Sequence, residues 1–264
     1  MAAFLALRMG RPLFCEGEPG TGKTSLAVGL AQALDVPLIR LQCHEGIDAS
    51  QALYDWDFPR QLLHLRTLEA ASAGALDAEA AESSLYTQRF LLARPLLRAL
   101  TEAPCVLLVD EIDRADDEFE ALLFEFLGEG PVPVPELGTI RAQRRPLVVL
   151  TSNRSRELHE ALRRRCLYHW IVYPGAAQVA AILRRTVSGA SERVIADASV
   201  FIGRVRDLDL DKPPGIAEAI DWVSALITLG VTDLVATTVA PTLGTLVKTP
   251  DDHDTLVAAL DDDG

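Results

Sequence analysis

The sequence predicts an α/β fold, in which a parallel sheet flanked by helices is followed by a small all-helical domain. Short apolar runs alternate with segments of helical periodicity over most of the chain. A glycine-rich loop, GEPGTGKT at residues 17–24, joins the first apolar run to a helical segment. Beyond about residue 174 only helical patterns remain. The predicted domains are therefore residues 1–173 and 174–264.

Four apolar runs are predicted to be strands, because buried parallel strands are short and apolar on both faces. These runs are residues 12–15, 38–43, 105–110 and 147–151. Apolar residues at helical spacing, such as Leu26, Leu30 and Leu34, predict the helices between them. The expected helices span about 24–34, 87–100, 118–127, 176–185, 191–203 and 216–229.

Two segments interrupt this alternation. Residues 70–84 are rich in Ala, Ser and acidic side chains, so we expect a surface insertion or a mobile loop there. In the segment PVPVPELGTIRA, residues 131–142, valines alternate with prolines before a Leu137-Gly138 turn. Prolines within a ladder belong on edge strands, so this segment predicts a projecting hairpin.

The overall charge limits the classes of partner. The chain of 264 residues has 38 acidic and 25 basic residues, which gives a formal charge of −13. Such a charge repels phosphate backbones and anionic lipids, so it disfavours nucleic acid as the main partner.

The cysteines and the apolar stretches bear on the compartment. Four cysteines without a CxxC pair fit a reducing cytoplasm, and the start of the chain lacks the pattern of a signal peptide. Residues 222–247 contain a single charge but are interrupted by Gly230, Pro241 and Gly244. Short buried helices therefore account for this stretch better than a membrane span.

The glycine-rich loop has the composition of a phosphate-binding loop. Its glycines let the backbone N–H groups point inward around phosphates at the start of a helix. Lys23 is expected to contact the β- and γ-phosphates of ATP, and the Thr24 hydroxyl to coordinate Mg²⁺ together with Asp110. The expected nucleotide-binding residues are Gly17, Glu18, Pro19, Gly20, Thr21, Gly22, Lys23, Thr24 and Asp110.

Polar residues at the ends of two later strands are candidates for catalysis. Asp110 and Glu111 follow four apolar residues, which places one carboxylate near Mg²⁺ and a second where it activates the attacking water. Asn153 follows the strand 147–151 and is positioned to orient that water and to sense the γ-phosphate. A helix-capping role for the acids and a turn-forming role for the amide are the alternatives.

Three arginines, Arg163 to Arg165, follow a short amphipathic helix. An arginine that reaches across a subunit boundary stabilises the charge on a transferred phosphoryl group. Alternatively, these arginines complement the helix dipole and remain in water. Cys43-His44 is less suited to a metal site, because consecutive strand residues point to opposite faces.

The segments GEPGTGKT, LLVDEIDRA, VVLTSN and EALRRRC, in this order and spacing, make the chain resemble an AAA+ ATPase over nearly its whole length. The segments LIRLQCHEGIDASQALYDWDFPRQLL and DEIDRADDEFEALLFEFL are similar to the MoxR branch, in particular to CoxD-like members associated with carbon monoxide dehydrogenase maturation.

This resemblance implies specific roles. They are a Walker A motif at 17–24, a Walker B pair at Asp110 and Glu111, a sensor at Asn153, and an arginine finger at Arg165 or Arg164. Residues 131–142 resemble the pre-sensor insertion, and the part beyond about 174 resembles the lid domain. The lid departs from the family pattern, because PPGIAEAIDW has Ala217 and Glu218 where a sensor arginine is usual. The lead before the first strand is short, so the adenine contacts are not assigned.

The resemblance also implies a homo-oligomer, a hexameric ring in the cytoplasm that remodels a client protein. A molybdenum enzyme is the candidate client, and a von Willebrand factor A domain protein is the candidate partner. We expect Mg²⁺-dependent ATP hydrolysis that drives remodelling or metal-cofactor maturation. The alternative is an ATP-gated binding module with little turnover.

Overall fold

The computed structural model describes residues 1–71, 77–129, 132–135, 137–142 and 144–262. The chain divides into two compact units. Unit 1 comprises Met1–Gly17 and Lys23–Trp170, and unit 2 comprises Glu18–Gly22 and Ile171–Gly264. The middle of the glycine-rich loop therefore groups with the C-terminal helices.

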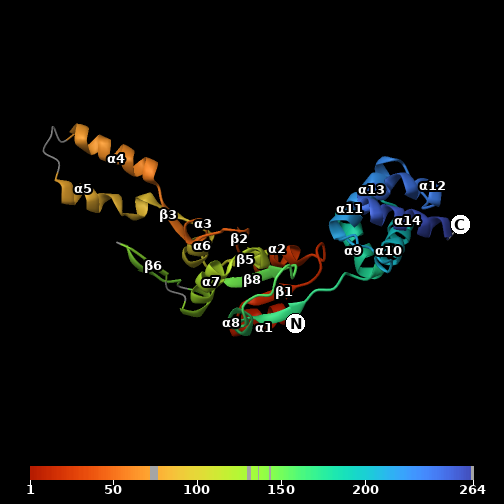
Figure 1. The fold of residues 1–264 in the computed structure, drawn as a ribbon, viewed down its shortest axis with the longest axis horizontal. Coiled ribbons are helices and arrows are strands. Elements are labelled where there is room, and N and C mark those ends of the chain that lie inside the picture. The colour runs from red at the N-terminus through yellow and green to blue at the C-terminus, as the bar shows by residue number, and fades with distance from the viewer. Residues whose placement is uncertain (72–76, 130–131, 136, 143, 263–264) are drawn as a thin grey trace. The chain divides into compact units, whose positions relative to one another are not determined.

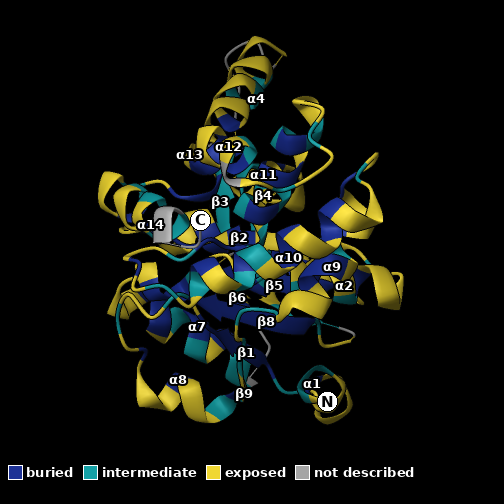
Figure 2. Cartoon of the chain, turned by 90° about the vertical axis from the view of Figure 1, so that its right-hand side faces the viewer, coloured by how far each residue is buried: buried dark blue, intermediate teal, exposed yellow. Residues whose placement is uncertain are grey.

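The centre of unit 1 is a five-stranded parallel sheet. In spatial order its strands are β2 (Leu38–Gln42), β5 (Val106–Asp110), β8 (Leu147–Ser152), β1 (Leu13–Glu16) and β9 (Leu167–Trp170). Every residue of β1, β5 and β8 is buried (Figure 2), which is why these strands are continuous apolar runs. The sequence pattern does not predict the edge strand β9, because its residues are partly exposed and form no apolar run.

Helices cover this sheet. They are α1 (Ala2–Met9), α2 (Lys23–Leu34), α6 (Pro95–Thr101), α7 (Asp117–Glu129) and α8 (Glu160–Arg165), with the 3-10 turn η2 (Ile112–Arg114). The short helix α3 (Ala49–Ala52) and the 3-10 turn η1 (Gln88–Phe90) belong with the insertion between β2 and β5. The buried side chains of α2 include Ala27 and Ala31, and their small size lets the helix lie close to β5 and β8. Phe14, Leu107 and Leu150 belong to the same buried core.

An insertion projects from unit 1 between β2 and β5 (Figure 1). In it, β3 (Tyr54–Trp56) pairs antiparallel with β4 (Leu91–Ala93), and α4 (Phe58–Ala71) packs beside α5 (Ala78–Leu85). Of the two alternatives for 70–84, the surface insertion agrees with the structure, whereas a loop is wrong for 70–71 in α4 and for 78–84 in α5, whose alanines and glutamates favour a helix. Residues 72–76 of that expected loop lie outside the described residues.

The helix predicted over 87–100 is also wrong in its first half. There the chain forms η1 and β4, because cross-strand pairing with β3 outweighs the local helical pattern. The helix begins only at Pro95, whose fixed φ suits the first helical position.

The predicted hairpin is confirmed as β6 (Val132–Val134) paired antiparallel with β7 (Gly138–Ile140). Val132 and Val134 are buried, whereas Pro133 between them is exposed. Pro131, where the predicted hairpin begins, lies outside the described residues.

Unit 2 is helical. Its elements are α9 (Ala176–Thr186), α10 (Glu192–Arg206), α11 (Ile216–Thr228), α12 (Ala236–Val239), η3 (Ala240–Thr242), α13 (Leu243–Leu246) and α14 (Pro250–Asp262). Trp222 is fully buried at the centre, stacks near Phe201, and donates its indole N–H to Thr242 Oγ1 at 2.8 Å. The apolar stretch 222–247 is thus divided among short helices, and no helix of the described chain is long and apolar enough to cross a membrane.

Candidate functional site

The glycine-rich loop leaves the carboxyl end of β1 and leads directly into α2, which begins at Lys23. Gly20 and Gly22 have left-handed φ angles of 75° and 93°, which residues with a Cβ adopt only with strain. The first N–H groups of α2 have no partner within the helix, so this end of the helix favours an anion. The structure therefore places the predicted phosphate loop in the strand–loop–helix context that such a loop requires.

The loop's lysine is held inward. Lys23 is 7% exposed, and its Nζ donates a hydrogen bond to the Gly17 carbonyl at 2.8 Å. A buried ammonium group requires acceptors or a compensating anion. A bound phosphate would supply both at this position.

The remaining loop residues are fixed by hydrogen bonds within unit 2. Thr21 is buried, and its hydroxyl donates to the Glu18 carbonyl at 2.9 Å. The Tyr173 hydroxyl donates to the Pro19 carbonyl at 3.0 Å. Burial is the largest cause that raises the pKa of Tyr173, so this hydroxyl remains a donor at neutral pH.

Asp110 is the centre of a hydrogen-bonded cluster at the carboxyl end of β5. The residue is 2% exposed. Thr24 Oγ1 donates to Asp110 Oδ1 at 3.0 Å, Thr151 Oγ1 donates to the same oxygen at 2.6 Å, and Arg40 Nη2 donates to Oδ2 at 2.6 Å. The structure thus brings together Thr24 and Asp110, whose oxygens are of the type that Mg²⁺ prefers. This pair fits Mg²⁺ bound together with a nucleotide phosphate.

Glu111 is held in a strained backbone conformation, with a φ of 56°. Its backbone N–H donates to Thr151 Oγ1 at 2.9 Å. Its carboxylate accepts a hydrogen bond from Gln42 Nε2 at 3.1 Å and forms an ion pair with Arg114 Nε at 3.1 Å. Both partners contact the same carboxylate oxygen, Oε2.

Asn153 lies directly after β8, the strand between β5 and β1. Its backbone N–H donates to Asp113 Oδ2 at 3.2 Å. Asp113 is buried, and it also accepts hydrogen bonds from the backbone and the hydroxyl of Ser155. Asp113 therefore fixes the loop that carries Asn153, beside the end of β1.

The arginines at the end of α8 differ in their surroundings. The guanidinium of Arg165 lies 3.5 Å from the centroid of the Phe124 ring, and its Nη1 donates to the Phe124 carbonyl at 2.7 Å. Arg164 is exposed and pairs with Glu160 one turn earlier, and Arg163 is also exposed. Arg165 is thus engaged within its own chain, whereas Arg164 is available to a second chain.

Within unit 2 the loop contacts the start of α11. The backbone N–H of Ile216 donates to the Gly20 carbonyl at 2.9 Å, and a Cβ on Gly20 would lie 2.6 Å from the Cα of Gly215. The carboxylate of Glu218 accepts from the Gly215 N–H at 3.1 Å and so caps the helix. Neither Ala217 nor Glu218 supplies a positive charge at this point.

Sequence reasoning missed several residues of the cluster, namely Arg40, Gln42, Asp113 and Thr151. Arg40 and Gln42 alternate along β2 and therefore share a face. The parallel register places Gln42 beside Asp110. The only signal in the sequence was the polar residues at alternate positions of an apolar strand, and their partner is known only once the strand order is known.

No group of three or more His, Cys, Asp or Glu side chains that could hold a metal occurs among the described residues. Cys43 is buried, whereas His44 is exposed. Burial is the largest cause that raises the pKa of the Cys43 thiol, to about 12, so it is protonated and a poor metal ligand at neutral pH.

Comparisons with known proteins agree with this fold. The sequence matches the ATPase family associated with various cellular activities (AAA) over residues 13–172. A mutant of Thermotoga maritima RuvB is structurally similar, with a TM-score of 0.52 at 17% identity, over 96% of this chain and 69% of that one. The Thermotoga maritima RuvB Holliday junction branch migration motor has a TM-score of 0.49 at 17% identity, over 96% and 67%. No curated protein matches the sequence.

Proposed function

The chain belongs to the AAA family of ATPases, and we propose that it hydrolyses ATP with Mg²⁺ at the glycine-rich loop. The observation that carries this proposal is the cluster around the buried Asp110, in which Thr24 and Asp110 share a hydrogen bond at the end of that loop. Helix ends and lysines bind phosphate in many proteins, but a hydroxyl and a carboxylate placed together beside them suit a metal-bound nucleotide.

Each residue then has a role in the reaction. Lys23 and the N–H groups of the loop bind the phosphates, and Mg²⁺ held by Thr24 and Asp110 would neutralise their charge. Glu111 accepts a proton from the attacking water once its carboxylate leaves Gln42 or Arg114. The side chain of Asn153 orients that water from the neighbouring strand.

The arginine finger of this proposal acts in a second copy of the chain. Arg164 is our first candidate because its side chain is 77% exposed and its pair with Glu160 is a surface ion pair that is easily broken. Arg165 would first have to leave the ring and the carbonyl of Phe124. A closed ring, of six subunits by resemblance, brings each arginine to the next nucleotide.

The biological task is proposed on the sequence resemblance to MoxR and CoxD-like proteins. On this proposal the ring works in the cytoplasm, where hydrolysis drives the remodelling of a client protein or the maturation of its metal cofactor. The candidate client is a molybdenum enzyme, and a von Willebrand factor A domain protein is the candidate partner. The projecting insertion and the hairpin provide surfaces for such contacts (Figure 1).

Phosphate release by mixed subunits tests the shared site. We expect Glu111→Gln and Arg164→Ala to be inactive alone and to regain activity when mixed, because some sites then combine a wild-type Glu111 with a wild-type Arg164. The same mixture made with Arg165→Ala is the matched comparison. If neither mixture recovers activity, the arginines do not act across subunits.

Nucleotide binding is tested separately with Lys23→Ala. This variant should lose ATP binding in a fluorescent-nucleotide titration, because the phosphates lose their buried cation. Tight ATP binding by the variant would contradict the proposed site.

The alternative is an ATP-gated binding module. It is favoured by the start of α11, where Glu218 caps the helix and positions 217 and 218, where the family usually has a sensor arginine, are Ala and Glu. Steady phosphate release that increases as the protein assembles supports the hydrolase. Tight binding without turnover at any protein concentration supports the switch.

A further inference from the structure

Unit 1 contains a cavity of about 230 Å³ that is separate from the glycine-rich loop. Pro12 and Pro146, which line it, directly precede β1 and β8. The cavity therefore lies at the amino ends of these strands, whereas the loop follows the carboxyl end of β1. In a parallel sheet these are opposite edges, so the cavity is not part of the ATP site described above.

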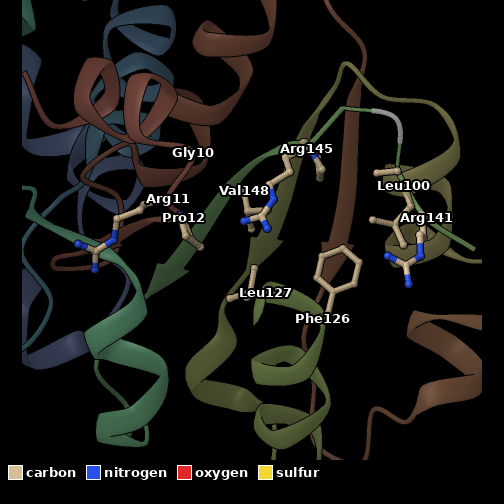
Figure 3. Close-up of a pocket in the computed structure, with 11 residues that line it drawn as sticks. Gly10, Arg11, Pro12, Leu100, Phe126, Leu127, Arg141, Arg145 and Val148 are labelled. Carbon is tan, nitrogen blue, oxygen red and sulfur yellow. The ribbon is translucent and has the colours of Figure 1, made fainter. Parts of the chain in front are cut away.

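The floor of the cavity is apolar. Leu100 and Phe126 are 4% and 7% exposed, and Leu127 and Val148 also line it. Figure 3 shows the Phe126 ring between the side chains of Arg141 and Arg145. An apolar group that enters this cavity would contact an aromatic ring and three aliphatic side chains.

The rim of the cavity is basic. Arg141 and Arg145 line it and are exposed, and within the described part of the chain neither forms an ion pair. Arg11 is held in place by hydrogen bonds to the carbonyls of residues 164–166. A neighbouring cavity of about 340 Å³ shares Arg11, Leu127 and Arg145 and extends to Arg165. The two cavities together are lined by four arginines, Arg11, Arg141, Arg145 and Arg165. They form a basic patch on a chain whose formal charge is −13.

We propose that this cavity binds a small amphipathic anion, an apolar chain or ring with one carboxylate or phosphate group. The apolar part would fill the floor, and Arg141 and Arg145 would hold the charged group, since guanidinium groups match carboxylate and phosphate oxygens. The volume restricts the size, because pockets for drug-sized ligands have about 300–1,000 Å³. A polar nucleotide does not match the apolar floor.

Octanoate is a suitable probe, titrated into the full chain by calorimetry, with 1-octanol as the uncharged comparison. We expect one saturable octanoate site per chain and at least about tenfold weaker binding of octanol, because the charged hydrogen bonds are lost. Lys23→Ala should bind octanoate as the wild type does, which separates this site from the ATP site.

Arginine variants locate the site. Arg145→Gln and Arg141→Gln should each weaken octanoate binding about tenfold. Arg144→Gln is the matched control, because Arg144 is exposed in the same loop but lines neither cavity. Unchanged thermal unfolding of all three variants shows that they are folded.

Three results would overturn the proposal. They are the absence of saturable binding up to about 10 mM octanoate, equal affinity for octanol, and an effect of Arg144→Gln as large as that of Arg145→Gln. The last result would indicate a diffuse attraction of anions to the basic loop instead of a site.

Discussion

Replacing Thr151 by valine tests the hydrogen-bonded cluster around Asp110. Thr151 is 1% exposed, and its hydroxyl both donates to Asp110 Oδ1 at 2.6 Å and accepts from the Glu111 N–H at 2.9 Å. Valine has nearly the same shape but makes neither bond. In this variant Asp110 still accepts hydrogen bonds from Thr24 and Arg40, whereas the backbone N–H of Glu111 loses its hydrogen bond to the Thr151 hydroxyl.

The expected cost follows from these two bonds. A hydrogen bond to a charged group is worth about 1.5–3 kcal/mol, and a buried unsatisfied N–H costs about 1–3 kcal/mol. The remaining partners of Asp110 reduce the first value, so we expect the free energy of unfolding to decrease by about 2–4 kcal/mol. Glu111 would also be less firmly held in its strained conformation. If this costs the transition state about 1.4 kcal/mol, phosphate release becomes about tenfold slower.

Urea unfolding followed by circular dichroism measures the first effect, and phosphate release measures the second. Thr101→Val is the matched control, because Thr101 is exposed and its hydroxyl bonds only to carbonyls of its own helix. It should change stability by no more than about 0.5 kcal/mol. If Thr151→Val is as mild as this control, the cluster does not stabilise the fold as we infer.

Three further predictions rest on particular contacts. Arg165→Ala should lower the free energy of unfolding by about 1–2 kcal/mol, because Arg165 packs on the Phe124 ring. Arg164→Ala should change it by less than about 0.5 kcal/mol, because Arg164 forms only a surface ion pair. Equal losses for the two variants in urea titrations would contradict this difference in surroundings. Gly46→Ala should lower the free energy of unfolding by about 1–2 kcal/mol, because the φ of Gly46 is near 75°. Gly20→Ala should lower it further, because Gly20 has a similar φ and a Cβ there would also lie 2.6 Å from a backbone atom. Similar thermal unfolding of the two variants would refute this. Burial raises the pKa of Cys43 to about 12, so its thiol is protonated at about pH 8. Cys43 should therefore react with a thiol reagent only after unfolding. Rapid labelling of Cys43 in the native protein, located by mass spectrometry, would show that the thiol is accessible and would contradict this.

Local patterns were sufficient for four of the five strands of the central sheet and for the loop, but not for the edge strand β9. The strands β1, β5 and β8 are buried on both faces, so each is a continuous apolar run that can be recognised without its neighbours. The insertion was predicted less well. β4 is three residues long and depends on pairing with β3, and a short strand has little signal of its own.

The sequence by itself determined the fold class, the phosphate loop and the residue types at the strand ends, because each depends on residues close together in the chain. Only the tertiary structure decided which of these residues meet. Arg40 and Thr151 converge on Asp110 from two other strands, and the strand order that brings them there is set by packing of the whole sheet. The same holds for Arg165, whose contact with Phe124 on another helix cannot be inferred from three consecutive arginines.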